Sequence, residues 1–227
     1  MLDVASGTGE AASVAIQIVG SAGFVVGADI SLEMLRSARV RLDEPLYSAV
    51  NADGQALPFR DGAFDAVVCQ LGLQFFPRPA AGIVEFRRVV RAGGVVAVCV
   101  NATSDRLPMW GNLADAMARY LTDDQRKVVA TNWSLSDPGR LAALFGGAWF
   151  QDIRVEQVSR EGTVDGFDDY WAPIEEGVGQ MPQAYLALNE TDRRSVRETV
   201  RARLAQYKSA DGKLTMSVEM LIGSGRA

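Results

Sequence analysis

The first thirty residues contain the pattern that most constrains the fold of this chain. Residues 2–5 are an apolar run typical of a strand, and the turn Ser6-Gly7-Thr8-Gly9 follows directly. Residues 10–20 carry apolar side chains at helical spacing, and residues 24–28 predict a second strand that ends at Asp29. A strand, a glycine turn, a helix and a second strand form a βαβ unit, which requires parallel strands and a right-handed crossover.

The same alternation continues to residue 101. Ser31 is placed to cap a helix that runs to Leu42. Further strands are predicted at 47–50, 64–69 and 95–100, and a helix at 79–90. This order predicts an α/β fold of the Rossmann-like, doubly wound type, with a mostly parallel sheet. Ligands of such sheets bind beyond the carboxyl ends of the strands.

After residue 101 the pattern changes. Residues 109–131, 137–145 and 183–208 read as helical, and 152–163 and 213–222 read as strands. Two late strands separated by helical segments predict an antiparallel edge, with residues 165–208 as a helical cover over the site. We interpret residues 1–227 as a single domain, with a ligand-binding core at 1–101 and helical segments at 102–151.

Composition excludes several classes of function. The chain has no histidine, which excludes a Ser-His-Asp triad and a His-based metal site, so no metal is predicted and no catalytic residue is assigned. The formal net charge of -5, with both signs scattered, argues against a nucleic-acid partner. No segment has the length and apolarity of a membrane span, and the start lacks the basic region of a signal peptide. With Cys69 and Cys99 interpreted as free buried thiols, we expect a cytoplasmic protein.

Two groups of residues predict a nucleoside-type ligand. Glycines at a strand-to-helix turn let the backbone approach a ligand closely, and Asp29, twenty positions after Gly9, can accept hydrogen bonds from ribose hydroxyls. The turn alone also matches the dinucleotide pattern G-x-G-x-x-A at residues 7–12. The second group is Ala52-Asp53-Gly54-Gln55 after the third strand, where an acid can accept a hydrogen bond from an adenine amino group. Leu57 and Phe59 are expected to anchor this loop.

With these motifs in order, the chain resembles the class I S-adenosylmethionine-dependent methyltransferases of the small-molecule and quinone-biosynthesis type. The similarity runs through residues 2–9, 27–31, 52–59 and 64–76, and on through 85–94. The resemblance implies a seven-stranded sheet with an antiparallel last strand, S-adenosyl-L-methionine as cofactor, and a transferase that methylates a small-molecule acceptor in line.

The resemblance also implies roles for matching positions. The implied cofactor-binding residues are Asp3, Ala5, Ser6, Gly7, Thr8, Gly9, Asp29, Ile30, Met34, Ala52, Asp53, Gly54, Gln55, Gln70 and Leu71. Gln74 and Phe75 are placed nearer the acceptor substrate, although core packing explains Phe75 equally well. Tyr170 and Trp171 in the predicted cover can line an aromatic acceptor pocket, and the alternative is packing of the cover on the body.

Two other functions remain open at this point. Members of this family usually carry helices before the first strand, whereas this chain begins inside it. That departure leads us to expect weak cofactor affinity and slow turnover, and leaves a non-catalytic S-adenosylmethionine-binding module as an alternative. An NAD(P)-dependent oxidoreductase is disfavoured, because none of Lys127, Lys208 and Lys213 follows a tyrosine at the four-residue spacing of short-chain dehydrogenases.

Overall fold

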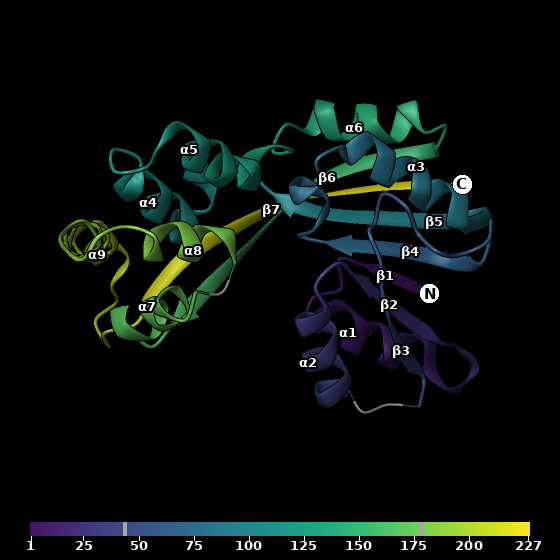
Figure 1. Ribbon diagram of the computed structural model, residues 1–227, viewed down its shortest axis with the longest axis horizontal. Coiled ribbons are helices and arrows are strands. Elements are labelled where there is room, and N and C mark those ends of the chain that lie inside the picture. The colour runs from purple at the N-terminus through teal and green to yellow at the C-terminus, as the bar shows by residue number, and fades with distance from the viewer. Residues whose placement is uncertain (43–44, 178) are drawn as a thin grey trace. The chain divides into compact units, whose positions relative to one another are not determined.

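The computed structural model describes residues 1–42, 45–177 and 179–227 (Figure 1). Its strands are β1 (Leu2–Val4), β2 (Val25–Asp29), β3 (Tyr47–Asn51), β4 (Phe64–Gln70), β5 (Val90–Asn101), β6 (Gln151–Val164) and β7 (Leu214–Arg226). Its helices are α1 (Glu10–Val19), α2 (Leu32–Leu42), α3 (Pro79–Val89), α4 (Pro108–Met117), α5 (Asp123–Ala130), α6 (Pro138–Gly147), α7 (Phe167–Glu175), α8 (Gln180–Leu186) and α9 (Glu190–Leu204). The helix predicted after residue 31 begins as expected, since the Ser31 hydroxyl accepts a hydrogen bond from the Met34 N–H at 3.3 Å.

The strands form one seven-stranded sheet in the order β3-β2-β1-β4-β5-β7-β6. The short strand β1 lies inside it, with Leu2 paired to Val26 of β2 on one side and to Val67 of β4 on the other, both in parallel. Strands β3, β2, β1, β4 and β5 pair in parallel. The last strand along the chain, β7, is antiparallel. The predicted fold class is therefore confirmed. The structure adds that β7 lies between β5 and β6, so β6 is the edge strand.

Two apolar layers hold the first part of the sheet, and Figure 1 shows α3 and α6 on one side of the strands and α1 and α2 on the other. Ile83 and Phe86 of α3 and Phe145 of α6 are fully buried together with Leu2 of β1. A smaller cluster joins α1 to β2, where Val25 is fully buried. Parallel strands covered on both faces are apolar almost throughout, which explains the continuous apolar runs in the sequence.

The chain separates into two compact units, of residues 1–100, 135–157 and 221–227 (the first unit) and residues 101–134 and 158–220 (the second unit). The second unit has its own core, in which Trp171 and Val196 are fully buried. The predictions of a single domain and of a helical cover over the site stay predictions, and Val178 of that segment lies outside the described residues. Every helix in the described part of the chain is too short or too polar to cross a membrane.

Two elements differ from their predicted extent. The helical segment at 109–131 is broken into α4 and α5, because the Thr122 side chain accepts a hydrogen bond from the Gln125 N–H and starts a new helix with a capping box. Strand β5 begins at Val90 rather than at residue 95. Val90 pairs with Phe64 and Val95 with Ala66, so the residues between Val90 and Val95 form a bulge. That bulge contains Gly93 and Gly94, which the sequence indicated as a turn.

Phe76 is inserted between two glycines and thereby positions the loop after β3. A Cβ on Gly54 would lie 2.7 Å from Cε2 of Phe76 and 2.9 Å from Cγ1 of Val4. A Cβ on Gly82 of α3 would lie 2.7 Å from Cδ2 of the same ring. On the α3 side the ring also packs against Phe86, with the two ring centroids 6.2 Å apart. The loop that contains Gly54 is thus fixed to the body of the first unit by one aromatic side chain.

We expect Gly54→Ala to destabilise the protein by about 1–3 kcal/mol, because the added methyl forces the Phe76 ring out of its position. Gly147→Ala is the matched control, since a Cβ there has no atom within 4 Å. The control is expected to change stability by less than about 0.5 kcal/mol. Urea unfolding of both variants measures this, and equal stabilities would show that the loop moves freely away from the ring.

Candidate active site at the carboxyl ends of the strands

The glycine turn after β1 has a backbone that few residue types tolerate. Ala5, Gly7 and Gly9 have φ values of +54°, +53° and +85°, all in the left-handed region. A Cβ on Gly9 would lie 2.7 Å from Cδ1 of Leu42, so this glycine closes the turn against α2. A Cβ on Gly7 would meet no atom within 4 Å. The backbone of Gly7 is therefore not covered by neighbouring side chains on this side, so a ligand can approach it closely.

Asp29 joins this turn to the end of β2. Its Oδ2 accepts a hydrogen bond from the Gly7 N–H at 2.8 Å, and its Oδ1 accepts one from the Ser31 N–H at 2.8 Å. The side-chain amide of Asn51, at the end of β3, donates to the backbone carbonyls of Asp29 and Ile30, both at 2.9 Å. Each carboxylate oxygen can accept more than one hydrogen bond, so Asp29 retains acceptor capacity for a ligand.

A group of buried polar atoms lies beneath the turn. Asp3 in β1 is 1% exposed, and neither of its carboxylate oxygens has a hydrogen-bond partner among the described residues. Burial raises the pKa of Asp3 to about 7, the nearby backbone N–H of Ala12 opposes this shift, and the negative charge of Asp29 adds to it. The buried hydroxyls of Ser6 and Tyr47 lie beside each other, and burial raises the pKa of Tyr47 more strongly than their interaction lowers it. Buried polar atoms are almost always hydrogen-bonded, so the carboxylate of Asp3 is the unusual member of this group.

The loop after β3 carries the second predicted group. Oδ1 of Asp53 accepts a hydrogen bond from the Gln55 N–H at 2.8 Å, which forms a tight turn and leaves the carboxylate exposed. Ala52 is tied to the end of β2, because its N–H donates to the Asp29 carbonyl at 3.0 Å. Oε1 of Gln55 accepts from the Arg78 N–H at 3.0 Å, at the start of α3.

The residues after this turn are held by an ion pair on α3. Arg88 donates to the carbonyls of Leu57 and Phe59 at 2.9 and 2.7 Å, and Glu85 accepts from the Leu57 N–H at 2.9 Å. Arg88 and Glu85 also pair with each other at 2.7 Å, which lowers the pKa of Glu85. Leu57 is buried and Phe59 packs edge-on against Phe64, so both anchor the loop as predicted.

The end of β4 approaches the turn after β1 closely. Leu71 has φ +54°, and its N–H donates to the Cys99 carbonyl at 2.8 Å. A Cβ on the next residue, Gly72, would collide with Cβ of Ala5. Gln70 is exposed at the strand end, whereas Gln74 is buried and Phe75 is half-buried in the following 3₁₀ turn. Burial raises the pKa of the neighbouring Cys69 to about 12, so its thiol stays protonated and does not act as a nucleophile.

Comparisons with known proteins bear on the same residues. Residues 2–98 match the family model of a methyltransferase domain. The demethylmenaquinone methyltransferase of Corynebacterium kroppenstedtii is 42% identical over 103 residues, which are 45% of this chain and 42% of that protein. The demethylmenaquinone methyltransferase of Clavibacter sepedonicus is 33% identical over 135 residues, which are 59% of this chain and 54% of that protein. The chain thus spans about half the length of these curated relatives.

The first part of the chain is thus similar to a methyltransferase domain. The fold agrees, since a structure of Haemonchus contortus phosphoethanolamine N-methyltransferase 2 in complex with S-adenosylhomocysteine matches with a TM-score of 0.60. That match has 17% sequence identity and covers 100% of this chain and 48% of that one. The resemblance seen in the sequence is therefore confirmed.

The residues at this edge of the sheet fit the cofactor that the resemblance implies, S-adenosylmethionine. The open face of Gly7 leaves room beside the turn, and Asp29 has acceptors for hydroxyl groups. The partnerless carboxylate of Asp3 is a feature that a cationic ligand nearby would stabilise. Ile30 and Met34 expose apolar side chains next to Asp29, with 75% of the Ile30 surface accessible. Among the described residues no cluster of His, Cys, Asp and Glu is arranged to hold a metal ion.

The structure brings most of the predicted site residues to one edge of the sheet, but it places Tyr170 and Trp171 in the core of the second unit. Trp171 is fully buried, stacks on Phe167 and donates its Nε1–H to Glu175 at 3.0 Å. The Tyr170 hydroxyl donates to the Met109 carbonyl at 2.7 Å. Both side chains pack within that unit, and a role in binding the acceptor stays a prediction.

Three residues that position the methyltransferase site were missed in the sequence. Tyr47 begins β3 and its hydroxyl lies beside Ser6, where a Cβ on Gly27 would meet both side chains. Gly72 permits the contact between the ends of β4 and β1, and Phe76 holds the loop that contains Gly54. A glycine directly after a buried strand signals close backbone approach, so Gly72 carried a usable signal. Tyr47 and Phe76 act through tertiary contacts that no local pattern indicates.

The raised pKa of Asp3 predicts a specific dependence of stability on pH. The folded-state pKa of about 7 exceeds the ordinary value of 3.8, so the contribution of Asp3 is fully present below about pH 4 and is lost as the pH rises through 7. We expect the wild type to lose about 2–4 kcal/mol relative to Asp3→Asn between pH 4 and pH 8.

Urea unfolding at both pH values measures this difference. The matched control is Glu33→Gln, which removes an exposed carboxylate from α2 and is expected to follow the wild-type profile. Parallel pH profiles for the wild type and Asp3→Asn would contradict the buried-carboxylate interpretation.

Proposed function

We propose that this protein is an S-adenosyl-L-methionine-dependent methyltransferase that acts on a small-molecule acceptor. The single observation that carries the proposal is the joint arrangement of Asp29, the Gly7 backbone and the buried carboxylate of Asp3 at the carboxyl ends of β1 and β2. The match to a methyltransferase domain covers these same residues. Catalysis by the whole protein is part of the proposal, because the chain spans about half the length of its curated relatives.

Each part of this edge of the sheet has a distinct role in the proposal. Asp29 would hold the ribose hydroxyls, and the turn from Ala5 to Gly9 would contact the methionyl part, with Asp3 beneath it. Ile30 and Met34 would pack on the adenine ring, and the exposed carboxylate of Asp53 would accept a hydrogen bond from its amino group. The order of these residues along the edge, from β1 through β2 to β3, supports the assignment.

The cofactor supplies an activated methyl group when bound, so the protein's own residues have mainly to orient the acceptor and exclude water. Gln70 and Leu71, at the end of β4, adjoin the turn through the contact of Gly72 with Ala5 and would border the transferred methyl. Gln74 and Phe75 follow directly and would lie nearer the acceptor. Alignment of this kind can supply about 7–11 kcal/mol of the barrier. With no histidine in the chain, the acceptor's proton would pass to solvent or to an Asp, Glu, Tyr, Lys or Cys side chain.

The acceptor class follows from the relatives rather than from the site. Both relatives described above are named demethylmenaquinone methyltransferases, which makes a quinol the first acceptor to test. In the reaction the bond between the methyl carbon and sulfur breaks, a bond from that carbon to the acceptor forms, and the acceptor loses a proton. A cytoplasmic location is part of the proposal and is supported by two cysteines that form no disulfide.

We expect calorimetry to detect S-adenosylhomocysteine binding and no NAD binding. Asp29→Ala is expected to weaken the former by about 1.5–3 kcal/mol, because hydrogen bonds to a charged group are lost. The control Glu33→Ala removes an exposed acid from α2 and should leave the dissociation constant unchanged. Thermal unfolding of Asp29→Ala without ligand separates a lost contact from a collapsed turn. Tight NAD binding without an S-adenosylhomocysteine signal would refute the proposed cofactor.

We expect radiolabelled methyl groups to pass from S-adenosylmethionine to a water-soluble demethylnaphthoquinol. Asp29→Ala should lower kcat/KM by at least tenfold, as the binding loss above requires. Chromatography of the labelled product identifies the methylated atom. Binding of the cofactor without transfer to this quinol or to a panel of phenols and amines would instead identify a non-catalytic binding module.

A further inference from the structure

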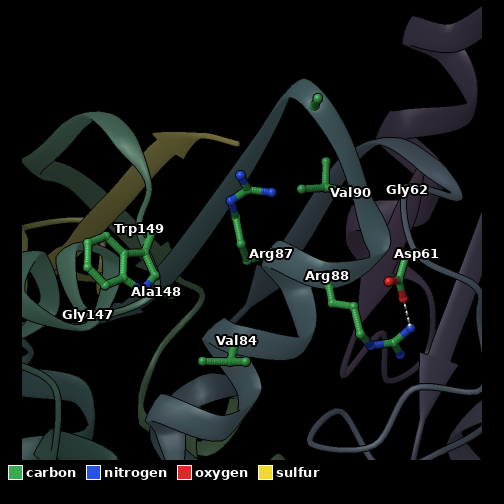
Figure 2. Close-up of a pocket in the computed structure, with 10 residues that line it drawn as sticks. Asp61, Gly62, Val84, Arg87, Arg88, Val90, Gly147, Ala148 and Trp149 are labelled. Carbon is green, nitrogen blue, oxygen red and sulfur yellow. Dashed lines mark hydrogen bonds and ion pairs between the residues drawn. The ribbon is translucent and has the colours of Figure 1, made fainter.

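A cavity lies in the first unit at the end of the strands opposite the candidate cofactor residues. Its volume is about 690 Å³, and its lining includes Gly62 just before β4, Val90 at the start of β5 and Trp149 just before β6 (Figure 2). These residues lie at the amino ends of their strands, whereas the candidate cofactor residues lie at the carboxyl ends. A volume of this size is within the range of small-molecule sites. The methyltransferase proposal makes no use of this cavity.

Trp149 occupies a backbone position that stability alone would give to glycine. It follows the last turn of α6, where the Phe150 N–H donates to the Phe145 carbonyl at 3.2 Å and the Trp149 N–H donates to the Gly146 carbonyl at 3.0 Å. These two hydrogen bonds form a Schellman motif, and the apolar contact that often accompanies it is present, with the Phe145 and Phe150 ring centroids 5.2 Å apart. The left-handed residue of this motif is usually glycine. Trp149 has φ +62° and is 82% exposed. A strained, solvent-facing tryptophan contributes little to the fold and suits contact with a ligand.

Arg87 contributes a positive charge to the lining of the cavity. No carboxylate among the described residues pairs with it, and its Nε is buried without a hydrogen-bond partner. Its guanidinium lies over the Phe150 ring at 5.8 Å from the centroid. The neighbouring Arg88 differs, because it pairs with both Asp61 and Glu85. Figure 2 shows Arg87 rising between Trp149 and Val90, while Arg88 turns away toward Asp61.

We propose that this cavity binds a small aromatic carboxylate, whose anionic group pairs with Arg87 and whose ring packs against Trp149. Apolar surface beside Arg87 and Trp149 comes from two further lining residues. Val84 of α3 has an exposed side chain, and Ala148 is buried. Guanidinium groups bind carboxylates through paired, charge-assisted hydrogen bonds, and aromatic rings pack on an indole in offset-stacked or edge-to-face arrangements. The site is independent of methyl transfer, so its test does not depend on the proposed enzyme.

The probe is 1-naphthoate, with the uncharged 1-naphthamide as the matched ligand. Binding is followed by NMR titration of the ¹⁵N-labelled protein, through the indole N–H signals of its four tryptophans. The signal that is lost in Trp149→Phe is that of Trp149. We expect saturable binding of 1-naphthoate near about 1 mM, as is usual for a ligand of this size. The Trp149 signal should shift selectively, and 1-naphthamide should bind at least tenfold more weakly.

Two variants and one control test the assigned residues. Arg87→Met keeps the aliphatic stem and should weaken 1-naphthoate at least tenfold, while Arg154→Met, an exposed arginine of β6, should not change it. Trp149→Gly should abolish binding yet unfold at an equal or higher urea concentration, because glycine relieves the left-handed backbone. Excess S-adenosylhomocysteine should not displace the probe. Absence of saturable binding, equal binding of the two probes, or displacement by S-adenosylhomocysteine would overturn the proposal.

Discussion

The hydrogen bond from the Gly7 N–H to the Asp29 carboxylate is the interaction on which the candidate active site depends. The turn after β1 holds Ala5, Gly7 and Gly9 in left-handed conformations, and for Ala5 that conformation is unfavourable. The turn is kept in place because its N–H groups are satisfied, at Gly7 by Asp29 and at Ser6 by the Ala28 carbonyl at 3.1 Å. Both acceptors belong to β2. Parallel pairing of β1 with β2 therefore sets the shape of the turn as well as its position.

Contacts farther along the sheet extend the same edge. Gly72 allows the end of β4 to lie against Ala5, and Phe76, a few residues later, holds Gly54 in the loop after β3. A short segment after β4 thus touches both the turn after β1 and the loop after β3. Changes in this segment would move two parts of the site together, although Phe76 itself faces the protein body. The arrangement explains why glycine occurs at positions 54 and 72, where any Cβ would collide with a neighbour.

The sequence was sufficient for the parts of the fold that repeat a local pattern. The βαβ alternation, the cap at Ser31 and the position of Asp29 at the end of β2 follow from spacing and residue type, and the observed elements agree with them. The hydrogen bond from the Gly7 N–H to Asp29 was not predicted. The position of β7 between β5 and β6 does not follow, because strand order depends on long-range pairing. Tyr170 and Trp171 illustrate the same limit: an aromatic pair on a predicted helix suits a ligand pocket or a core, and the local pattern does not distinguish the two.

Four of the described residues other than glycine have a left-handed backbone, and three of them lie at the candidate or proposed binding edges of the first unit; the fourth is Asp152 in β6. Ala5 and Leu71 end neighbouring strands and meet through Gly72, and Trp149 precedes the edge strand β6 at the other end of the sheet. Such conformations cost about 1–3 kcal/mol each and persist only where the surroundings fix them. At Ala5 and Leu71 the backbone is held by hydrogen bonds to adjacent strands, so the strain follows from the shape of the site. At Trp149 they come from the end of α6 alone, and a glycine would satisfy the same bonds without strain. Folding therefore does not require an indole at this position, and this contrast separates the two edges. The candidate cofactor edge is shaped by the sheet, whereas the other edge carries an exposed side chain for which we propose a binding role.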